Sequence, residues 1–222
     1  MITHLQNDYI HHFGLTGTNY QVLNSVLKGH CILYDPHSCD PCLSNNGQQC
    51  DNATSKQIFV LETNENVTCV NIEDFLNQFV GKKADSKSKC DLLLYDGSKI
   101  SFVDMYCGKE KFIFPHDTTH TDGRIEHKKG KLATVRQQIT STIDKLCEVP
   151  SIEKLIQTFQ KKEGIFGYRG KNANKSPQQE TPEESNISIF IKTAEMASND
   201  LYSHLTHGFL FKTVKYPEVY VW

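Results

Sequence analysis

The chain has 222 residues, a formal net charge of −2 and a mean hydropathy of −0.47, values typical of a folded globular protein. A net charge so close to zero gives no overall electrostatic attraction for nucleic acid, so nucleic-acid binding would need a local basic face. The first thirty residues lack the apolar segment of a secretory signal, and no apolar run approaches the roughly 18 residues of a membrane span. We therefore expect a cytoplasmic protein with no membrane partner.

Residues 1–56 are predicted to form an extension that precedes a domain over residues 57–222. The best helical pattern of the extension runs over residues 20–27, and residues 31–52 are rich in turn-forming residues. This loop contains a Cys-x7-Cys-x2-Cys-x7-Cys array made of Cys31, Cys39, Cys42 and Cys50. Four thiolates suffice for a structural Zn²⁺ site, whereas the alternative is a loop with reduced thiols.

The domain is predicted to begin with a strand over residues 57–61 and a helix over residues 72–80. The apolar residues of this helix recur at helical spacing, with Asn71 as its N-cap and Gly81 as its end. They are Ile72, Phe75, Leu76, Phe79 and Val80. A β-hairpin follows, in which strands 91–95 and 100–107 are joined by the turn at Asp96-Gly97.

The second half continues with a short strand at 111–115 and a polar loop that contains His116, His120 and His127. Periodic apolar residues then predict a helix over 132–146, and a second helix follows at 152–162. The remaining elements are a strand at 165–168, a polar loop at 169–186, a strand at 187–191, a short helix at 194–205, and strands at 209–214 and 218–222.

The hairpin carries two carboxylates that are candidates for a metal site. Asp91 opens its first strand and Asp104 lies near the end of its second strand, so the two can meet at one end of the sheet. Mg²⁺ and Mn²⁺ prefer carboxylate oxygens and water, and such an ion can activate water against a phosphodiester. Alternation places Asp104 on the same face as Phe102 and Tyr106, where a carboxylate is costly unless it meets a partner or a cation.

The two acids on this hairpin, followed by the Gln-rich helix, resemble the core of the PD-(D/E)XK nuclease superfamily. The resemblance covers about residues 71 to 192. It implies an α/β fold with a restriction-endonuclease-like αβββαβ core, in which helices flank a mixed sheet. It also implies that Asp91 and Asp104 bind Mg²⁺ or Mn²⁺ with the Met105 carbonyl, and that Gln138, beside Gln137, projects toward the site.

The chain departs from this family at the motif lysine, where it has Tyr106. Tyrosine has an unperturbed pKa of about 10, so it can donate a hydrogen bond but adds no positive charge near neutral pH. A lysine elsewhere can supply that charge, and the candidates for this role and for nucleic-acid binding are Lys109, Lys111, Lys129 and Lys131. Glu73 could add a further carboxylate, although acids are also favoured in the first turn of a helix by its dipole.

Two functions follow from these observations. The first is a metal-dependent nuclease acting on DNA rather than RNA, in a restriction or defence-type system. The second is a catalytically inactive subunit with the same fold that binds nucleic acid or a partner protein. The residue that separates these hypotheses is Tyr106.

Overall fold

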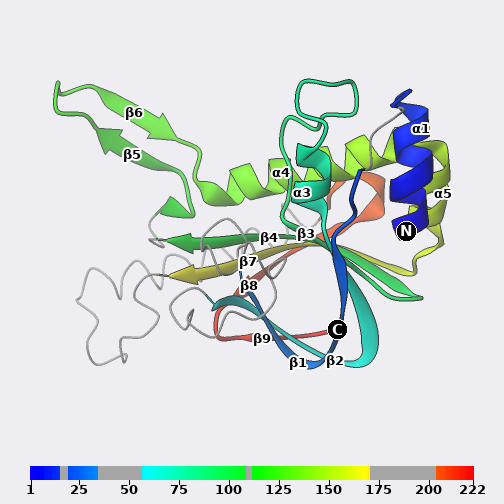
Figure 1. Ribbon diagram of the computed structural model, residues 1–222. Helices are drawn as coiled ribbons and strands as arrows, with labels where there is room; N and C mark the ends of the chain where they lie inside the picture. Colours follow the sequence, from blue (N-terminus) through cyan, green and yellow to red (C-terminus); the bar gives the residue numbers. More distant parts are fainter. Residues whose placement is uncertain (16–19, 35–56, 109–111, 171–203) are drawn as a thin grey trace.

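The computed structural model describes residues 1–15, 20–34, 57–108, 112–170 and 204–222. A seven-stranded mixed sheet forms the centre of the molecule, in the order β1, β2, β3, β4, β7 and β8, with β9 paired to β2 (Figure 1). The pairs β1–β2, β2–β3 and β3–β4 are antiparallel, whereas β4–β7, β7–β8 and β2–β9 are parallel. The strands are β1 (Asn24–Tyr34), β2 (Gln57–Asn71), β3 (Leu92–Tyr95), β4 (Lys99–Gly108), β7 (Lys161–Gly170), β8 (Leu210–Lys215) and β9 (Val219–Val221).

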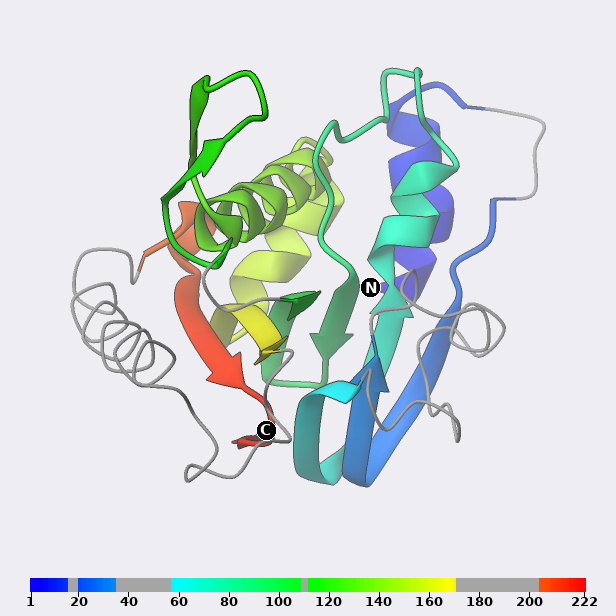
Figure 2. The same cartoon turned by 90° about the vertical axis from the view of Figure 1, so that its left-hand side faces the viewer.

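The helices cover one face of this sheet, as two perpendicular views show (Figures 1 and 2). They are η1 (His4–Tyr9), a π-helix that continues into α1 (Ile10–His12), then α3 (Ile72–Asn77), α4 (Lys131–Cys147) and α5 (Pro150–Thr158), followed by the single turn η5 (Thr206–Gly208). The longest helix, α4, has the expected apolar stripe, and its members are fully buried: Val135, Ile139, Ile143 and Leu146. Within the described ranges no helix is long and apolar enough to span a membrane.

Two hydrophobic cores lie on opposite sides of the central strand β4. Ile100 and Phe102 point into the core beneath the helices, whereas Val103 and Met105 point into the second core, around which β1, β2 and β9 curl. Every side chain from residue 100 to residue 105 is buried. The strand therefore follows the predicted alternation, and it has a core on each face.

A second, two-stranded sheet projects from the body just before α4 (Figures 1 and 2). It is formed by β5 (His116–Thr119) and β6 (Ile125–Lys128), which pair antiparallel. The polar stretch that contains His116, His120 and His127 was expected to be a loop, and this expectation was wrong. Seven of the eight residues paired across the two strands are polar, so the hairpin lacks the apolar alternation that usually identifies a strand.

The central hairpin and the helices on either side of it are confirmed. Leu92 pairs with Val103 and Tyr95 with Ile100, in the predicted antiparallel arrangement. The N-cap of α3 is Asn71, whose side chain accepts a hydrogen bond from the Asp74 N–H at 3.0 Å. This helix ends at Asn77, before the predicted end, and Val80 is 63% exposed.

Several other boundaries differ from the expectations. The predicted strand at 111–115 does not form over its described residues, which turn at 112–114 and bury Ile113. The mixed α/β class is confirmed, whereas the finer αβββαβ core is not. The helical pattern over residues 20–27 does not form a helix. Residues 24–27 begin β1, and the N-terminal helix lies at residues 2–12. The helix expected at 152–162 ends at Thr158, and β7 begins at Lys161. The strand predicted at 187–191 lies outside the described residues, and so does the helix predicted at 194–205 except for its last two residues, which are not helical.

A buried ion pair lies at the first residue of β4. Lys99 Nζ is 3.0 Å from Glu163 Oε2 and donates to the Tyr220 hydroxyl at 2.6 Å. Burial opposes ionisation of Glu163, but hydrogen bonds from Lys212, Tyr220 and Lys99 outweigh it and lower the Glu163 pKa to about 2. Burial also lowers the pKa of Lys99. The pair connects β4, β7 and the C-terminal strand.

We expect Glu163→Gln to destabilise the protein by about 3–5 kcal/mol, because it leaves the Lys99 ammonium buried without its carboxylate. The Glu163 pKa is lower in the folded state than in the unfolded chain, so its stabilisation is present above pH 5 and is lost as the pH falls toward 2. The wild type should lose about 3 kcal/mol in this range. Urea unfolding against pH measures this loss. Glu163→Gln should lack it, whereas the exposed Glu218→Gln should keep it.

Candidate active site

The candidate site lies where β3, β4 and α3 meet, and Asp91 connects all three. Its main-chain carbonyl accepts hydrogen bonds from the N–H groups of Ile72 and Glu73, at 3.2 and 3.3 Å, in the first turn of α3. Its carboxylate Oδ2 accepts from the Met105 N–H of β4 at 2.6 Å. The β3–β4 ladder ends at the pair Leu92–Val103, so the Asp91 side chain extends the hydrogen bonding of β4 beyond the end of β3.

Asp104 lies on the helix-covered face of β4 and is only 1% exposed. Its carboxylate acts on the thiol of Cys90, together with those of Asp91 and Glu73: burial and these three negative groups raise the pKa of Cys90 well above its ordinary range. All three carboxylates therefore contribute negative potential at this thiol. A role of Glu73 as a further carboxylate beside the two hairpin acids remains a prediction.

The lysine that approaches this site comes from the first turn of α4. Lys131 Nζ lies over the Tyr106 ring, 5.8 Å from its centroid, which is within the range of a cation–π contact. Burial raises the pKa of Tyr106, so the phenol stays neutral and protonated. The structure therefore places the Lys131 ammonium beside the Tyr106 ring.

Gln138 connects Lys131 to the segment that precedes Asp91. Its Oε1 accepts from Lys131 Nζ at 3.4 Å, and its Nε2 donates to the Lys89 carbonyl at 3.0 Å. Its neighbour Gln137 is exposed. Of the two glutamines, Gln138 is therefore the one that lies at the site, where it orients a lysine and a backbone carbonyl.

The remaining predicted site residues lie elsewhere. Lys129 is exposed between β6 and α4. Cys31 is a half-buried free thiol in β1, opposite Leu61. The other predicted ligands and basic residues, namely Cys39, Cys42, Cys50, Lys109 and Lys111, lie outside the described residues, so the zinc site remains a prediction.

Over the described ranges, no three His, Cys, Asp or Glu side chains are grouped closely enough to hold a metal ion between them. Mg²⁺ commonly binds through only one or two carboxylates and completes its shell with water and substrate phosphates. The hard oxygen donors Asp91 and Asp104 fit this pattern. The described residues do not provide a closed site in which protein ligands alone surround the ion.

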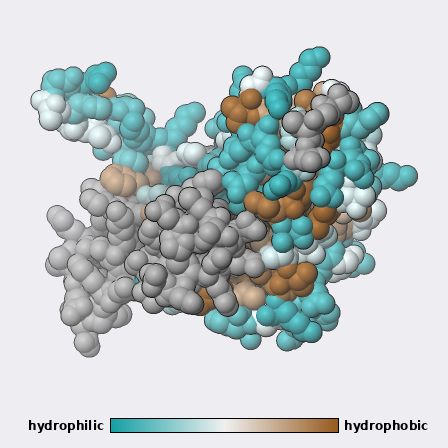
Figure 3. All heavy atoms as spheres, in the orientation of Figure 1, coloured by the Kyte–Doolittle hydropathy of each residue, from teal (hydrophilic) through white to brown (hydrophobic). Residues whose placement is uncertain are grey.

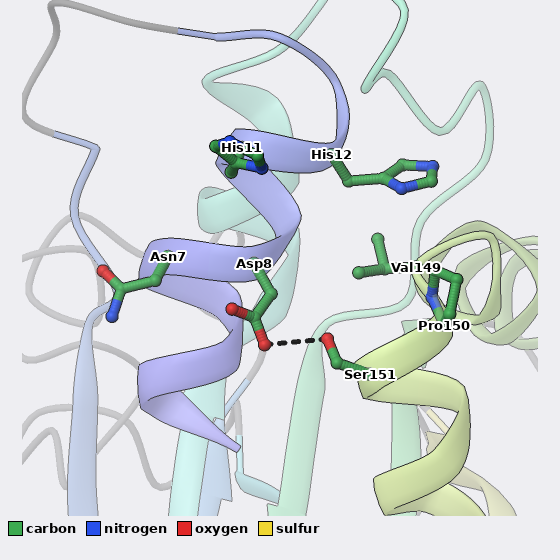
Figure 4. Close-up of a pocket in the computed structure, with 7 residues that line it drawn as sticks. All are labelled: Asn7, Asp8, His11, His12, Val149, Pro150 and Ser151. Atoms are coloured by element: carbon green, nitrogen blue, oxygen red, sulfur yellow. Dashed lines mark hydrogen bonds between the residues drawn. The ribbon is translucent and has the colours of Figure 1, made fainter.

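A separate open pocket lies between the N-terminal helix and α5 (Figure 4). Asp8 points toward Ser151, whose hydroxyl donates to the Asp8 carboxylate at 2.7 Å. His4 contacts the same oxygen, and these two hydrogen bonds lower the pKa of Asp8. This carboxylate therefore connects two helices.

The comparisons identify no relative: no protein-family model, no curated protein and no solved structure matches this chain.

Two substitutions separate the structural role of Asp91 from its charge. Asp91→Ala removes the acceptor of the Met105 N–H and should lower the free energy of unfolding by about 1–3 kcal/mol. Asp91→Asn retains an oxygen acceptor of the same shape, so it should cost less than about 1 kcal/mol. Urea unfolding measures both values. Amide hydrogen exchange should show faster exchange at Met105 in the alanine variant only; equal exchange in all three proteins would contradict this role.

Proposed function

We propose that the protein is a divalent-metal-dependent nuclease acting on DNA. The observation that carries this proposal is the burial of Asp104 on the helix-covered face of β4, one residue before Met105, whose N–H donates to the Asp91 carboxylate. Burial of a carboxylate beside apolar side chains is expensive, and buried acids are a common feature of catalytic and metal sites. The resemblance to the PD-(D/E)XK superfamily supports the same conclusion.

Asp91 and Asp104 are the residues that would hold the ion. Bound Mg²⁺ or Mn²⁺ would activate water and offset the negative charge of the scissile phosphate. The hydrogen bond from the Met105 N–H and the hydrogen bonds to the Asp91 carbonyl fix this aspartate at the end of the sheet, so its carboxylate is oriented before any ion or substrate binds.

Lys131 would provide the electrostatic contribution that Tyr106 cannot. Its ammonium is held beside the Tyr106 ring and Gln138, at the N-terminal end of α4, where the helix dipole adds further positive potential. A positive charge at this position stabilises the charge that develops on a phosphate during hydrolysis. The Tyr106 hydroxyl can donate a hydrogen bond to the same group.

A second candidate is a noncatalytic subunit that uses the same fold to bind nucleic acid or a partner protein. The observation that favours it is Tyr106 itself, because a neutral phenol replaces the charged group at this position of the motif. Both candidates predict binding of a polyanion or partner near Lys131. Only the first predicts metal-dependent cleavage.

We expect the wild type to nick plasmid DNA or to degrade single-stranded DNA with Mg²⁺ or Mn²⁺, and to lose this activity in EDTA. Asp91→Asn/Asp104→Asn should be inactive but folded, because both substitutions preserve shape. A second measurement does not depend on activity: Mn²⁺ should raise the thermal unfolding temperature of the wild type but not of the double variant, because binding to the folded state stabilises it. Parallel assays with RNA test the preference for DNA.

These results distinguish the two candidates. Stabilisation by Mn²⁺ together with cleavage supports the nuclease. DNA binding with neither cleavage nor Mn²⁺ stabilisation supports the noncatalytic subunit. A protein that neither cleaves nor binds DNA would overturn the nuclease and leave partner-protein binding as the function.

The role of Lys131 has its own test. Lys131→Met should reduce the cleavage rate by roughly 10²-fold, the usual effect of losing one group that stabilises transition-state charge. Adding Tyr106→Lys to this variant should restore much of the rate, because it returns an ammonium to the same location from the strand. Single-turnover cleavage measures both effects, with the exposed Lys154→Met as the control. Full activity in Lys131→Met would exclude this role.

A further inference from the structure

The β5–β6 hairpin, residues 116–128, forms an arm whose root is fixed to the body. At the root, the Leu132 N–H donates to the Ile113 carbonyl at 2.9 Å, and Ile113 is only 2% exposed. Gly130 adopts a φ of 82°, and a Cβ atom there would lie 2.4 Å from the Phe114 carbonyl carbon. The two ends of the arm therefore pack against each other at a point where only glycine fits. Because Ile113 at this root is buried in the core, the core fixes the direction of the arm.

This root lies beside the candidate active site. Lys129 and Gly130 connect β6 to α4, and Lys131, the first residue of α4, contacts Tyr106 and Gln138. A ligand that lies along the arm would therefore reach Lys131 at the start of α4. The views in Figures 1 and 2 both show the arm rising from the start of α4 and away from the main sheet.

The surface of the arm is hydrophilic (Figure 3). Its one large exposed apolar side chain is Ile125. The cores of protein–protein interfaces are depleted of charged residues, whereas this arm carries charged and hydrogen-bonding side chains along both strands. Its composition therefore favours a polar, charged ligand over the apolar surface of another protein.

Each acid of the arm lies close to a histidine, lysine or arginine side chain of the arm itself. Asp117 lies 2.5 Å from His127, and Asp122 lies 3.9 Å from Arg124. Glu126 contacts both His120 and Lys128. These pairs reduce the repulsion that a phosphate backbone would otherwise meet, while the exposed Lys129 adds a positive charge at the root.

We propose that this arm inserts into the major groove of duplex DNA and positions the duplex at the candidate active site, an inference that rests on the proposed function. The major groove is about 12 Å wide and admits a two-stranded β-ribbon. Arg124, near the tip, presents donors suited to a guanine edge, and the threonines of β5 present hydroxyl groups. Lys129 contacts the phosphate backbone and fixes the register of the arm on the duplex.

Two double variants with the same change in charge test this inference. Arg124→Gln/Lys129→Gln removes positive charge from the arm, whereas Lys83→Gln/Lys154→Gln removes the same charge from exposed sites on the body. Fluorescence anisotropy measures their affinity for a labelled duplex and for one of its single strands over a range of salt concentrations. All four side chains are exposed, and circular dichroism confirms that each variant is folded.

We expect the arm variant to lose duplex affinity by about ten-fold or more and to bind with a salt dependence shallower by about 1 to 2 in log–log slope. The body variant should change by less than about two-fold, and binding of the single strand should depend little on the arm. Methylation of guanine N7, which modifies the major groove, should interfere with binding of the wild type. Netropsin, which occupies the minor groove, should not compete.

Equal duplex affinity of the arm and body variants, in a wild type that binds DNA, would overturn the inference while leaving the proposed function intact, and would point to protein contact by the arm. Displacement by netropsin would exclude the major groove. A wild type that binds and cleaves single-stranded DNA but binds no duplex would overturn the inference alone, whereas one that neither binds nor cleaves either form of DNA would overturn the proposed function as well.

Discussion

The two-sided burial of β4 is the constraint on which the rest of the structure depends. Residues 100–105 pack alternately into a core beneath the helices and a core enclosed by the curled sheet, while β3 and β7 bond to the two edges of the strand. A strand held on both faces and both edges has little freedom to shift. Asp104 belongs to this run, so the candidate site inherits the rigidity of the core and is positioned before any ligand arrives.

Asp91 shows how a structural role and a chemical role can share one residue. Its carboxylate continues the hydrogen bonding of β4 past the last pair with β3, and its carbonyl receives the first amides of α3. A carboxylate has two oxygens with about four acceptor sites, so a bond to the Met105 N–H is compatible with a cation on the same group. The same hydrogen bond that stabilises the sheet end would also orient Asp91 as a ligand of the proposed metal ion. Because the two roles overlap, Asp91→Asn is the informative substitution: it removes the charge and keeps an oxygen that can accept the Met105 hydrogen bond.

The sequence predicts local features of this fold better than its long-range contacts. The central hairpin and α4 are encoded by short apolar patterns, and both form as expected. The β5–β6 arm has no apolar alternation because it has no core, whereas the Phe112-Ile113-Phe114 run resembles a strand but only anchors the arm at Ile113. Lys131 is 25 positions from Tyr106, and only the packing of α4 on β4 brings the two together. Local sequence patterns do not predict a contact between residues this far apart in the chain.

The charges at the site also couple the two ligands of the proposed nuclease. Glu73, Asp91 and Asp104 all contribute negative potential at the Cys90 thiol, so a phosphodiester that approaches these acids meets an excess of negative charge. A divalent cation reverses that balance, because it offsets two of the carboxylates and leaves Lys131 to attract the phosphate. Metal and DNA should then each bind more tightly in the presence of the other, as thermodynamic linkage requires of any coupled pair. A noncatalytic subunit whose DNA contacts lay only along the arm would bind DNA without such coupling, because the arm neutralises its own acids.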